Sequence, residues 1–237
     1  MTTVRFRTFK AIEDPEACER FIIGHRRVLE IFDIKMITSN KAVWVDHPNT
    51  YVILVESVEE SPKVLAGGRI QIADDILPLP IEDAVGRVDK KIIDIVNFHK
   101  QKITGEFCGL WNSREIAGYG IGSIFLGWCG AALARALGMD TLFALCAPAT
   151  VRPSKQVGFE IERSLGDNGY FNYPKLNLIA TAMIIPDVQV LSGAIDIVKS
   201  TVDSLMQNPI QTKTTEGPKG EITIEYDLSS TFRRLKK

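Results

Sequence analysis

The sequence is poor in the residues that build disulfide frameworks and zinc sites. Its four cysteines are scattered without a CxxC pair, and none of the three histidines stands near one at ligand spacing. This pattern argues against a disulfide framework and indicates a reducing compartment. The chain also lacks the uncharged apolar run of ~20 residues that a membrane helix needs, and its N-terminus lacks the apolar segment of a signal peptide. We therefore expect a cytoplasmic chain with no metal and no membrane span.

An excess of one charge is also missing. The 28 lysines and arginines balance 29 aspartates and glutamates, so no overall field favours nucleic acid or a membrane surface as partner. Hydrophobic residues make up 45% and charged residues 24% of the 237 positions, as in an ordinary globular protein with a sizeable core. We expect one domain over residues 1–187, followed by an extension of helix and strand over residues 188–237.

Apolar periodicity predicts alternating strands and helices. Asp14 and Pro15 have the residue types favoured at the N-cap and first position of a helix. Strands are expected at residues 4–12, 50–57, 63–72, 105–112, 141–148, 176–185 and 220–228. Helices are expected from Pro15 onward and at 87–100, 121–137 and 187–207, with a short helix or turn at 151–159 and a loop at 208–220. This order predicts an α/β (α+β) fold with a mixed, twisted central sheet flanked by helices.

The stretch AGYGIGS, residues 117–123, places three glycines between an expected strand and an expected helix. Glycine permits positive φ angles and close approach of a ligand, and a helix N-terminus attracts phosphate. Two phosphate-binding patterns do not fit. A P-loop would end in Gly-Lys-Ser/Thr, and the dinucleotide fingerprint GxGxxG would need glycine at Ser123 or Phe125. A tight turn needed only for packing is the other interpretation.

The same stretch resembles the acetyl-CoA loop, R/Q-x-x-G-x-G/A, of the GNAT superfamily of N-acyltransferases. Ala117 stands where that family has arginine or glutamine, and the other residues match in register: Gly118, Tyr119, Gly120, Ile121, Gly122 and Ser123. Farther along, KQVGFE at residues 155–160 resembles the segment that follows the fifth strand of that fold. The resemblance implies the GNAT fold for residues 1–187 and a CoA thioester as donor, its pyrophosphate held by backbone amides of the loop.

The resemblance also assigns roles beside the loop. It implies that the backbone of Leu110 and Asn112 pairs with the pantetheine arm of CoA. Arg152 and Lys155 would meet the ribose phosphate, with a solvated basic face as the alternative. The many Ile, Leu and Val residues between Arg69 and Glu106 would suit a pocket for more than an acetyl group, or they are simply core.

The N-terminal half resembles a branch of this superfamily, the autoinducer (acyl-homoserine lactone) synthases and the long-chain N-acyl amino acid synthases. Asp46, Arg69 and Glu106 match an Asp before the second strand, a G-x-x-R strand and an E-x-S-R strand in those families. Cys108 and Gly109 replace the serine and arginine of E-x-S-R. These departures argue against lactone synthesis from S-adenosylmethionine and leave acyl transfer from acyl-CoA, or an acyl-carrier protein, onto an amine such as an amino acid.

The expected reaction is direct attack of an amine on a thioester, which needs a base for the amine proton. Alternation within the strand 106–112 divides its side chains between two faces. One face carries Glu106, Cys108, Leu110 and Asn112, and the other carries Phe107, Gly109 and Trp111. Glu106 is the candidate base, and pairing with Arg69 or Lys102 is its structural alternative. Gly109 is the candidate for a bulge that opens the sheet. Cys108 is a nucleophile only in a ping-pong scheme and otherwise a small core residue.

Two further side chains complete the expected site. Arg69 would orient a substrate carboxylate, or else form a structural ion pair with Asp46 or a carboxylate of the segment 81–83. Tyr170 is the candidate general acid, because Ser154 stands where many GNAT enzymes have a tyrosine. Packing on the sheet is the alternative for Tyr170.

Two other functions stay open at this point. The replaced residues suit a non-catalytic acyl-CoA-binding regulatory module on a GNAT scaffold. The C-terminal helix and strand suit an interaction surface that extends a partner's sheet, including that of a homodimer.

Overall fold

The structure, a computed structural model, describes residues 2–31, 42–119, 121–173 and 178–232. Its strands form a single ten-stranded mixed sheet. In chain order the strands are β1 (Thr2–Lys10), β2 (Thr50–Ser57), β3 (Val64–Ile72), β4 (Thr104–Asn112), β5 (Thr141–Cys146), β6 (Glu160–Ile161), β7 (Tyr170–Tyr173), β8 (Leu178–Ile185), β9 (Ile210–Gly217) and β10 (Gly220–Asp227). The helices are α1 (Pro15–Ile31), α2 (Pro80–Val85), α3 (Lys91–His99), α4 (Gly122–Ala136), α5 (Pro148–Val157), α6 (Asp196–Gln207) and α7 (Ser229–Phe232), with the 3₁₀ helices η1 (Ala11–Glu13) and η3 (Ala42–Asp46).

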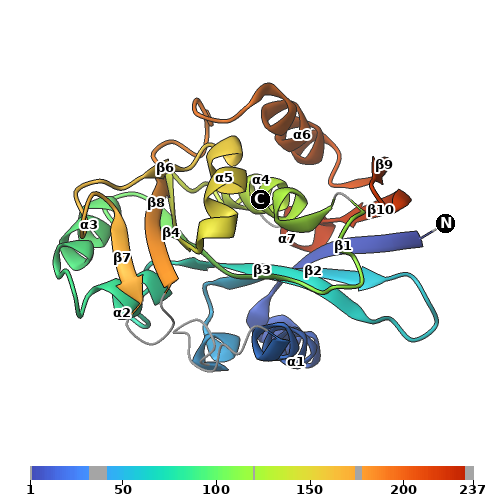
Figure 1. The fold of residues 1–237 in the computed structure, drawn as a ribbon, viewed down its shortest axis with the longest axis horizontal. Coiled ribbons are helices and arrows are strands. Elements are labelled where there is room, and N and C mark those ends of the chain that lie inside the picture. The colour runs from blue at the N-terminus through green and yellow to red at the C-terminus, as the bar shows by residue number, and fades with distance from the viewer. Residues whose placement is uncertain (1, 32–41, 120, 174–177, 233–237) are drawn as a thin grey trace.

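The strands lie in the order β6-β8-β5-β4-β3-β2-β1-β10-β9, and β7 pairs with β8 beside this row. The pairs β1–β10 and β4–β5 are parallel, and the other neighbours are antiparallel. The twisted sheet runs through the middle of the molecule with helices on both sides (Figure 1). The expected mixed sheet flanked by helices is confirmed.

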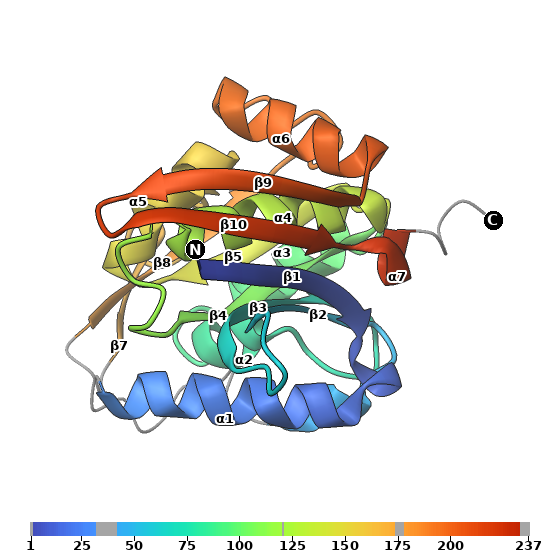
Figure 2. The ribbon, with the colours of Figure 1, turned by 90° about the vertical axis from the view of Figure 1, so that its right-hand side faces the viewer.

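Each face of the sheet buries its own apolar layer. One face packs against α4 through the largest core cluster, which includes Phe107, Leu142 and Met183. The opposite face carries two smaller clusters, one under α2 and α3 around Phe143 and one under α1 around Trp111. Figure 2 shows α1 below the sheet and α6 above it, with α4 on the α6 side. The two apolar clusters on this face are separated by a boundary, and the polar side chains of Arg69 and Glu106 lie there.

Most expected elements are confirmed, and the errors fall at weakly patterned segments. Asp14 caps α1, since its Oδ1 accepts a hydrogen bond of 3.0 Å from the N–H of Ala17. The loop expected at residues 208–220 is wrong, because β9 occupies most of it and pairs with β10. The helix expected from residue 187 begins only at Asp196. No pattern in the sequence indicated the short elements α2, β6 and β7.

The four cysteines are free and buried. None of the helices in the described part of the chain is long and apolar enough to cross a membrane. Among the described residues, no cluster of three or more His, Cys, Asp or Glu side chains could hold a metal ion.

Strand β4 contains a bulge at Gly109. Its register with β3 shifts there, because Arg69 pairs with Cys108 whereas Gly67 pairs with Trp111. Gly109 has a φ of 59°, which an L side chain rarely adopts. A Cβ atom at this position would also lie 2.8 Å from Nη1 of Arg69. Glycine is therefore required here both by the backbone and by the arginine beside it.

The bulge reverses which face the following residues of β4 occupy. Leu110 lies with Phe107 on the α4 side of the sheet. A Cβ atom added at Gly68 would lie 3.2 Å from Leu110 and 2.8 Å from Phe107, so both side chains are on the same face. Trp111 lies against α1, on the same side as Glu106. The expectation of strict alternation, with Leu110 beside Glu106 and Trp111 beside Phe107, is wrong for this reason. One extra residue in a strand turns every later side chain to the other face.

Candidate functional site

The strands β4 and β5 separate after a short paired segment. They are joined over three residue pairs, from Thr104–Thr141 to Glu106–Phe143. Beyond Glu106, β4 has no strand partner on its β5 side in the described part of the chain, while β5 continues to pair with β8. A strand with one unpaired side can offer backbone groups to an extended ligand. Leu110, one of the two residues expected to do so, is half-buried in this segment.

The glycine loop leads from the end of β4 into α4. Two turns shape it, closed by hydrogen bonds of 3.3 Å from the N–H of Ala117 to the carbonyl of Arg114 and from the N–H of Tyr119 to the carbonyl of Ile116. Gly118 has a φ of 92°. Ile116 is buried at 3% exposure and anchors the loop to the core. The expected loop residue Gly120 lies outside the described residues.

The N-terminus of α4 carries no anion of its own. Its N-cap residue is Ile121, which has no side chain able to cap, and the first turn contains no acidic residue. A Cβ atom added at Gly122 would meet no atom of the described residues within 4 Å, so the space beside this helix start is open. Unsatisfied N–H groups and the positive end of the helix dipole favour an anion at such a position.

Glu106 lies where β4 leaves β5, and only 2% of it is exposed. Its Oε2 accepts a hydrogen bond of 2.6 Å from the N–H of Ile81 in α2. Burial raises the pKa of this carboxyl to about 8, against the lowering effects of that hydrogen bond and the positive charge of Arg69. Lys102, an alternative partner considered from the sequence, lies instead near Asp140, at 3.8 Å.

Arg69 shares the boundary with Glu106. It is 2% exposed and lies on β3, two residues before Gln71, which pairs with Glu106 on β4. Its guanidinium Cζ lies 4.8 Å from the centre of the Trp44 ring, within the range of a cation–π contact. Burial lowers the pKa of His25 to about 4, and the positive charge of Arg69 adds to this lowering. His25 is therefore neutral at pH 7.

Aromatic rings surround Arg69 on the α1 side. Phe21 meets Trp44 and Trp111 edge-on, at centroid distances of 5.6 and 5.8 Å, and His25 stacks on Trp111 at 6.4 Å. The indole Nε1 of Trp111 is buried without a hydrogen-bond partner among the described residues. These rings make a rigid wall on the side of the sheet that carries Glu106.

Cys108 does not have the character of a nucleophile. It is buried beside Arg69, and burial raises the pKa of its thiol to about 12. The thiol is therefore neutral at pH 7, as in a core cysteine.

The remaining expected residues lie apart from this centre. Asp46 is exposed at the end of η3 and forms no ion pair with the described residues. Tyr170 is 41% exposed on β7, and β8 and β5 separate it from β4. Three strand spacings amount to roughly 14 Å, so the structure does not bring Tyr170 to Glu106. Ser154 contacts Cys146 instead, with 3.4 Å between Oγ and Sγ.

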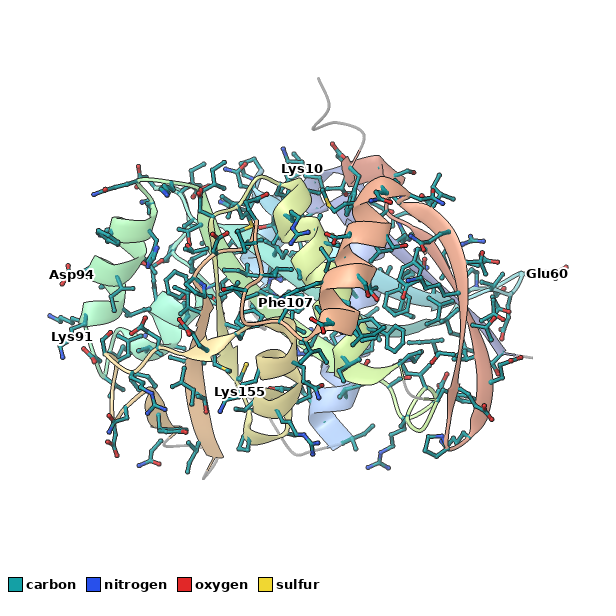
Figure 3. The ribbon with its side chains drawn as sticks, turned by 90° about the horizontal axis from the view of Figure 1, so that it is seen from above. Lys10, Glu60, Lys91, Asp94, Phe107 and Lys155 are labelled. Atoms are coloured by element: carbon teal, nitrogen blue, oxygen red, sulfur yellow. The ribbon has the colours of Figure 1, made fainter. Side chains whose placement is uncertain are left out.

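Two expected cations are exposed on α5. Arg152 and Lys155 lie one helical turn apart, and α5 packs beside α4 where Val157 approaches Gly127. Figure 3 contrasts Lys155, on α5, with Phe107, which lies in the interior between the layers. Both side chains are exposed to solvent.

Sequence reasoning missed several residues of the site. Trp44 precedes an expected site residue by two positions, but nothing in the sequence predicted that it would cover Arg69. Gln71 follows Arg69 by two positions on a strand, so alternation could have placed it on the same face. Its Nε2 donates hydrogen bonds to the carbonyls of Leu77 and Pro78, at 3.2 and 3.0 Å. Lys219 comes from a segment interpreted as a loop, so its contact with Gly118 could not be foreseen.

Comparison by sequence finds no matching family model and no matching curated protein. Solved structures do match. The structure of FeeM, an N-acyl amino acid synthase from uncultured soil microbes, matches at a TM-score of 0.61 and 15% identity, over 84% of this chain and 99% of that one. BjaI, a CoA-dependent acyl-homoserine lactone synthase solved with SAM and isopentyl-CoA, matches at 0.52 and 10% identity, over 98% and 99% of the two chains.

A third match is a mutant of an agmatine N-acetyltransferase in its apo form, with a TM-score of 0.52 and 11% identity over 76% of this chain and 98% of that one. Identities this low establish the architecture and leave the chemistry to the residues of this chain. The expected fold is confirmed by these matches. The chain has the fold of the GNAT N-acyltransferases.

Proposed function

We propose that the protein is an N-acyltransferase that moves an acyl group from a CoA thioester to the amino group of a small carboxylate-bearing acceptor such as an amino acid. One observation carries this proposal. Strand β4 loses β5 as a partner at Glu106 and then leads directly into the glycine loop and the uncapped start of α4. A buried carboxyl, an open strand side and an anion-attracting helix end thus follow one another along a single segment.

The donor would lie along this segment. The amide-bearing pantetheine arm can hydrogen-bond to β4 beyond its last pair with β5, near Leu110 and Asn112, as an added strand does. The pyrophosphate would then meet the N–H groups at the start of α4. Arg152 and Lys155 support this donor, because their exposed positive charges on α5 attract phosphates. An acyl-carrier protein, which presents the same pantetheine arm, is the other donor of this chemistry.

The reaction transfers one acyl group without a covalent enzyme intermediate. The amine nitrogen attacks the thioester carbonyl carbon, a C–N bond forms, and the C–S bond breaks to release the thiol. Glu106 accepts the proton that the amine loses, and the thiolate takes up a proton from water or a neighbouring donor. A carboxyl with a pKa of about 8 is matched to an amine near neutral pH.

Arg69 supports the assignment of a carboxylate-bearing acceptor. It is the buried cation nearest to Glu106 on β3 and β4, and it lies on the same face of the sheet. A guanidinium binds a carboxylate through two parallel hydrogen bonds. The ring of Trp44 fixes its plane.

The proposal is tested by mixing the protein with acetyl-CoA or a long-chain acyl-CoA and a panel of amino acids and simple amines. Free thiol release and the mass of the amide product are the two readouts. Glu106→Gln keeps an acceptor for the Ile81 N–H but removes the base, so turnover should fall at least ~100-fold. Glu82→Gln is the matched control, because Glu82 also accepts a backbone N–H at the start of α2. Full activity in Glu106→Gln would overturn the assignment of the base.

A second function is favoured by one specific observation. The carboxyl group of Glu106 already accepts a hydrogen bond from the N–H of Ile81. The raised pKa of Glu106 also keeps this group largely protonated at pH 7. Both features suit a structural carboxyl in a module that binds acyl-CoA without turning it over. Under this alternative, acyl-CoA binds to the wild type and to Glu106→Gln alike, and neither releases thiol with any acceptor.

A further inference from the structure

The hairpin of β9 and β10 touches the glycine loop. The N–H of Lys219, in the turn of this hairpin, donates a hydrogen bond of 2.9 Å to the carbonyl of Gly118. Its side chain lies along the same residue, with Cγ, Cδ and Cε at 2.9, 3.1 and 3.2 Å from the position of a Cβ on Gly118. Figure 2 shows the turn end of the hairpin beside the segment that leads from β4 to α4. A part of the chain remote in sequence thus helps to form the loop.

The ammonium group of Lys219 is available. The residue is exposed, and its side chain forms no ion pair with the residues that the structure describes. The nearest carboxylates along the hairpin, Glu216 and Glu221, are exposed and lie opposite each other across the two strands. The methylene stem is held against Gly118, which leaves the charged end to project past the loop.

The loop has no lysine or arginine directly beside Gly118. Its charged residues, Arg114 and Glu115, come before Ile116, and the residues on either side of Gly118 are Ala117 and Tyr119. The start of α4 a few residues later also lacks an acidic side chain. Lys219 therefore adds a cation from outside the loop, beside the position proposed for the donor phosphates.

We propose that Lys219 contacts the pyrophosphate of the CoA donor, so that the C-terminal hairpin is part of the donor site. This inference rests on the proposed function. The backbone hydrogen bond to Gly118 sets the position of the lysine, and its ammonium supplies the charge. Removing residues 208–237 would remove a binding group as well as two strands.

The test compares Lys219→Gln with Lys63→Gln, which removes the same charge from the exposed β2–β3 turn. Dissociation constants are measured by calorimetry for CoA, dephospho-CoA and pantetheine. We expect Lys219→Gln to raise the Kd of CoA and of dephospho-CoA about threefold to tenfold, because a charge-assisted contact is lost. Pantetheine, which has no phosphate, should bind both variants as it binds the wild type. The difference for CoA should shrink in high salt.

The outcomes separate this inference from the proposed function. If the wild type binds CoA and Lys219→Gln binds it equally well, the role of Lys219 is overturned and the donor site stands. If the loss is seen with CoA but not with dephospho-CoA, the contact is with the 3′-phosphate, and the pyrophosphate assignment is overturned. A wild type that binds no CoA at all overturns both. Unchanged unfolding midpoints in both variants ensure that the affinities report on the contact.

Discussion

The carboxylate of Glu106 accepts a 2.6 Å hydrogen bond from the backbone N–H of Ile81. This contact joins the strand that ends its pairing with β5 to the start of α2. It lowers the pKa of the carboxyl, yet burial outweighs it and holds the pKa at about 8. The same residue thus has a structural partner and the proton affinity of a base.

The rate of acyl transfer should follow the ionisation of Glu106. A general base acts only when deprotonated, so kcat/KM should rise with pH and level off above about 8. An ordinary glutamate would give a plateau from about pH 5 or 6 upward. A pH–rate profile with a fixed acyl-CoA and acceptor measures this, and a flat profile between about pH 6 and 9 would remove Glu106 as the base.

Folding stability should also depend on the ionisation of Glu106, but it should fall with rising pH where the rate of acyl transfer rises. The ordinary pKa of a glutamate is 4.5, and Glu106 in the folded chain has a pKa of about 8. Between these values the folded state holds a proton that the unfolded state has lost. The free energy of unfolding should therefore fall as pH rises from 4.5 to about 8, by at most about 1.4 kcal/mol per pH unit, and the contribution should be constant above about 8.

Urea unfolding of the wild type and Glu106→Gln over this pH range isolates the effect. The variant lacks the titrating group, so its stability should fall less steeply with pH than that of the wild type. If the two plots of stability against pH are parallel, Glu106 has its ordinary pKa in the folded chain.

Gly109→Ala should be strongly destabilising. Its φ of 59° already penalises a side chain, and the new Cβ would lie 2.8 Å from the Arg69 guanidinium. Strain and overpacking together should cost about 2–4 kcal/mol in chemical unfolding. Gly138→Ala is the control, because Gly138 also has a positive φ of 70° but its Cβ would stay 3.9 Å from the nearest atom. Equal losses in the two variants would show that Arg69 can move away.

Gly118→Ala and Gly122→Ala should separate two roles of the loop glycines. Gly118 has a φ of 92° and the stem of Lys219 against it, so alanine there should cost about 1–2 kcal/mol and weaken CoA binding. Gly122 faces open space at a helical position, so alanine there should change stability by less than about 1 kcal/mol. Thermal unfolding and CoA titration of both variants measure this, and a stable Gly118→Ala would show that the loop adapts.

The fold could be predicted from the sequence where patterns were strong. Long apolar strands and the cap at Asp14 indicated the core elements, and the glycine loop indicated the place of α4. β9 was hidden because its threonines, lysine and glutamate, which are exposed or half-buried, give no apolar alternation. An edge strand is defined by its neighbour β10, and a sequence pattern contains no information about that neighbour.

The site was foreseen only in part, for a physical reason. Glu106 and Cys108 were expected on one face of the strand, and they lie there because both precede the bulge at Gly109. Trp111 was placed wrongly, since a bulge depends on a φ angle at Gly109 that the sequence permits without requiring. Trp44 and Lys219 reach the site through contacts between distant segments, which no local spacing encodes.

The most direct measurement is the unfolding midpoint in the presence of acetyl-CoA, a long-chain acyl-CoA and NAD at matched concentrations. A ligand that binds only the folded state stabilises it by about 2.7 kcal/mol at about 100 times its Kd. The acyl-CoA compounds should raise the midpoint and NAD should not. If no CoA compound raises it, or if NAD raises it equally, the glycine loop does not hold a CoA donor and the account is contradicted.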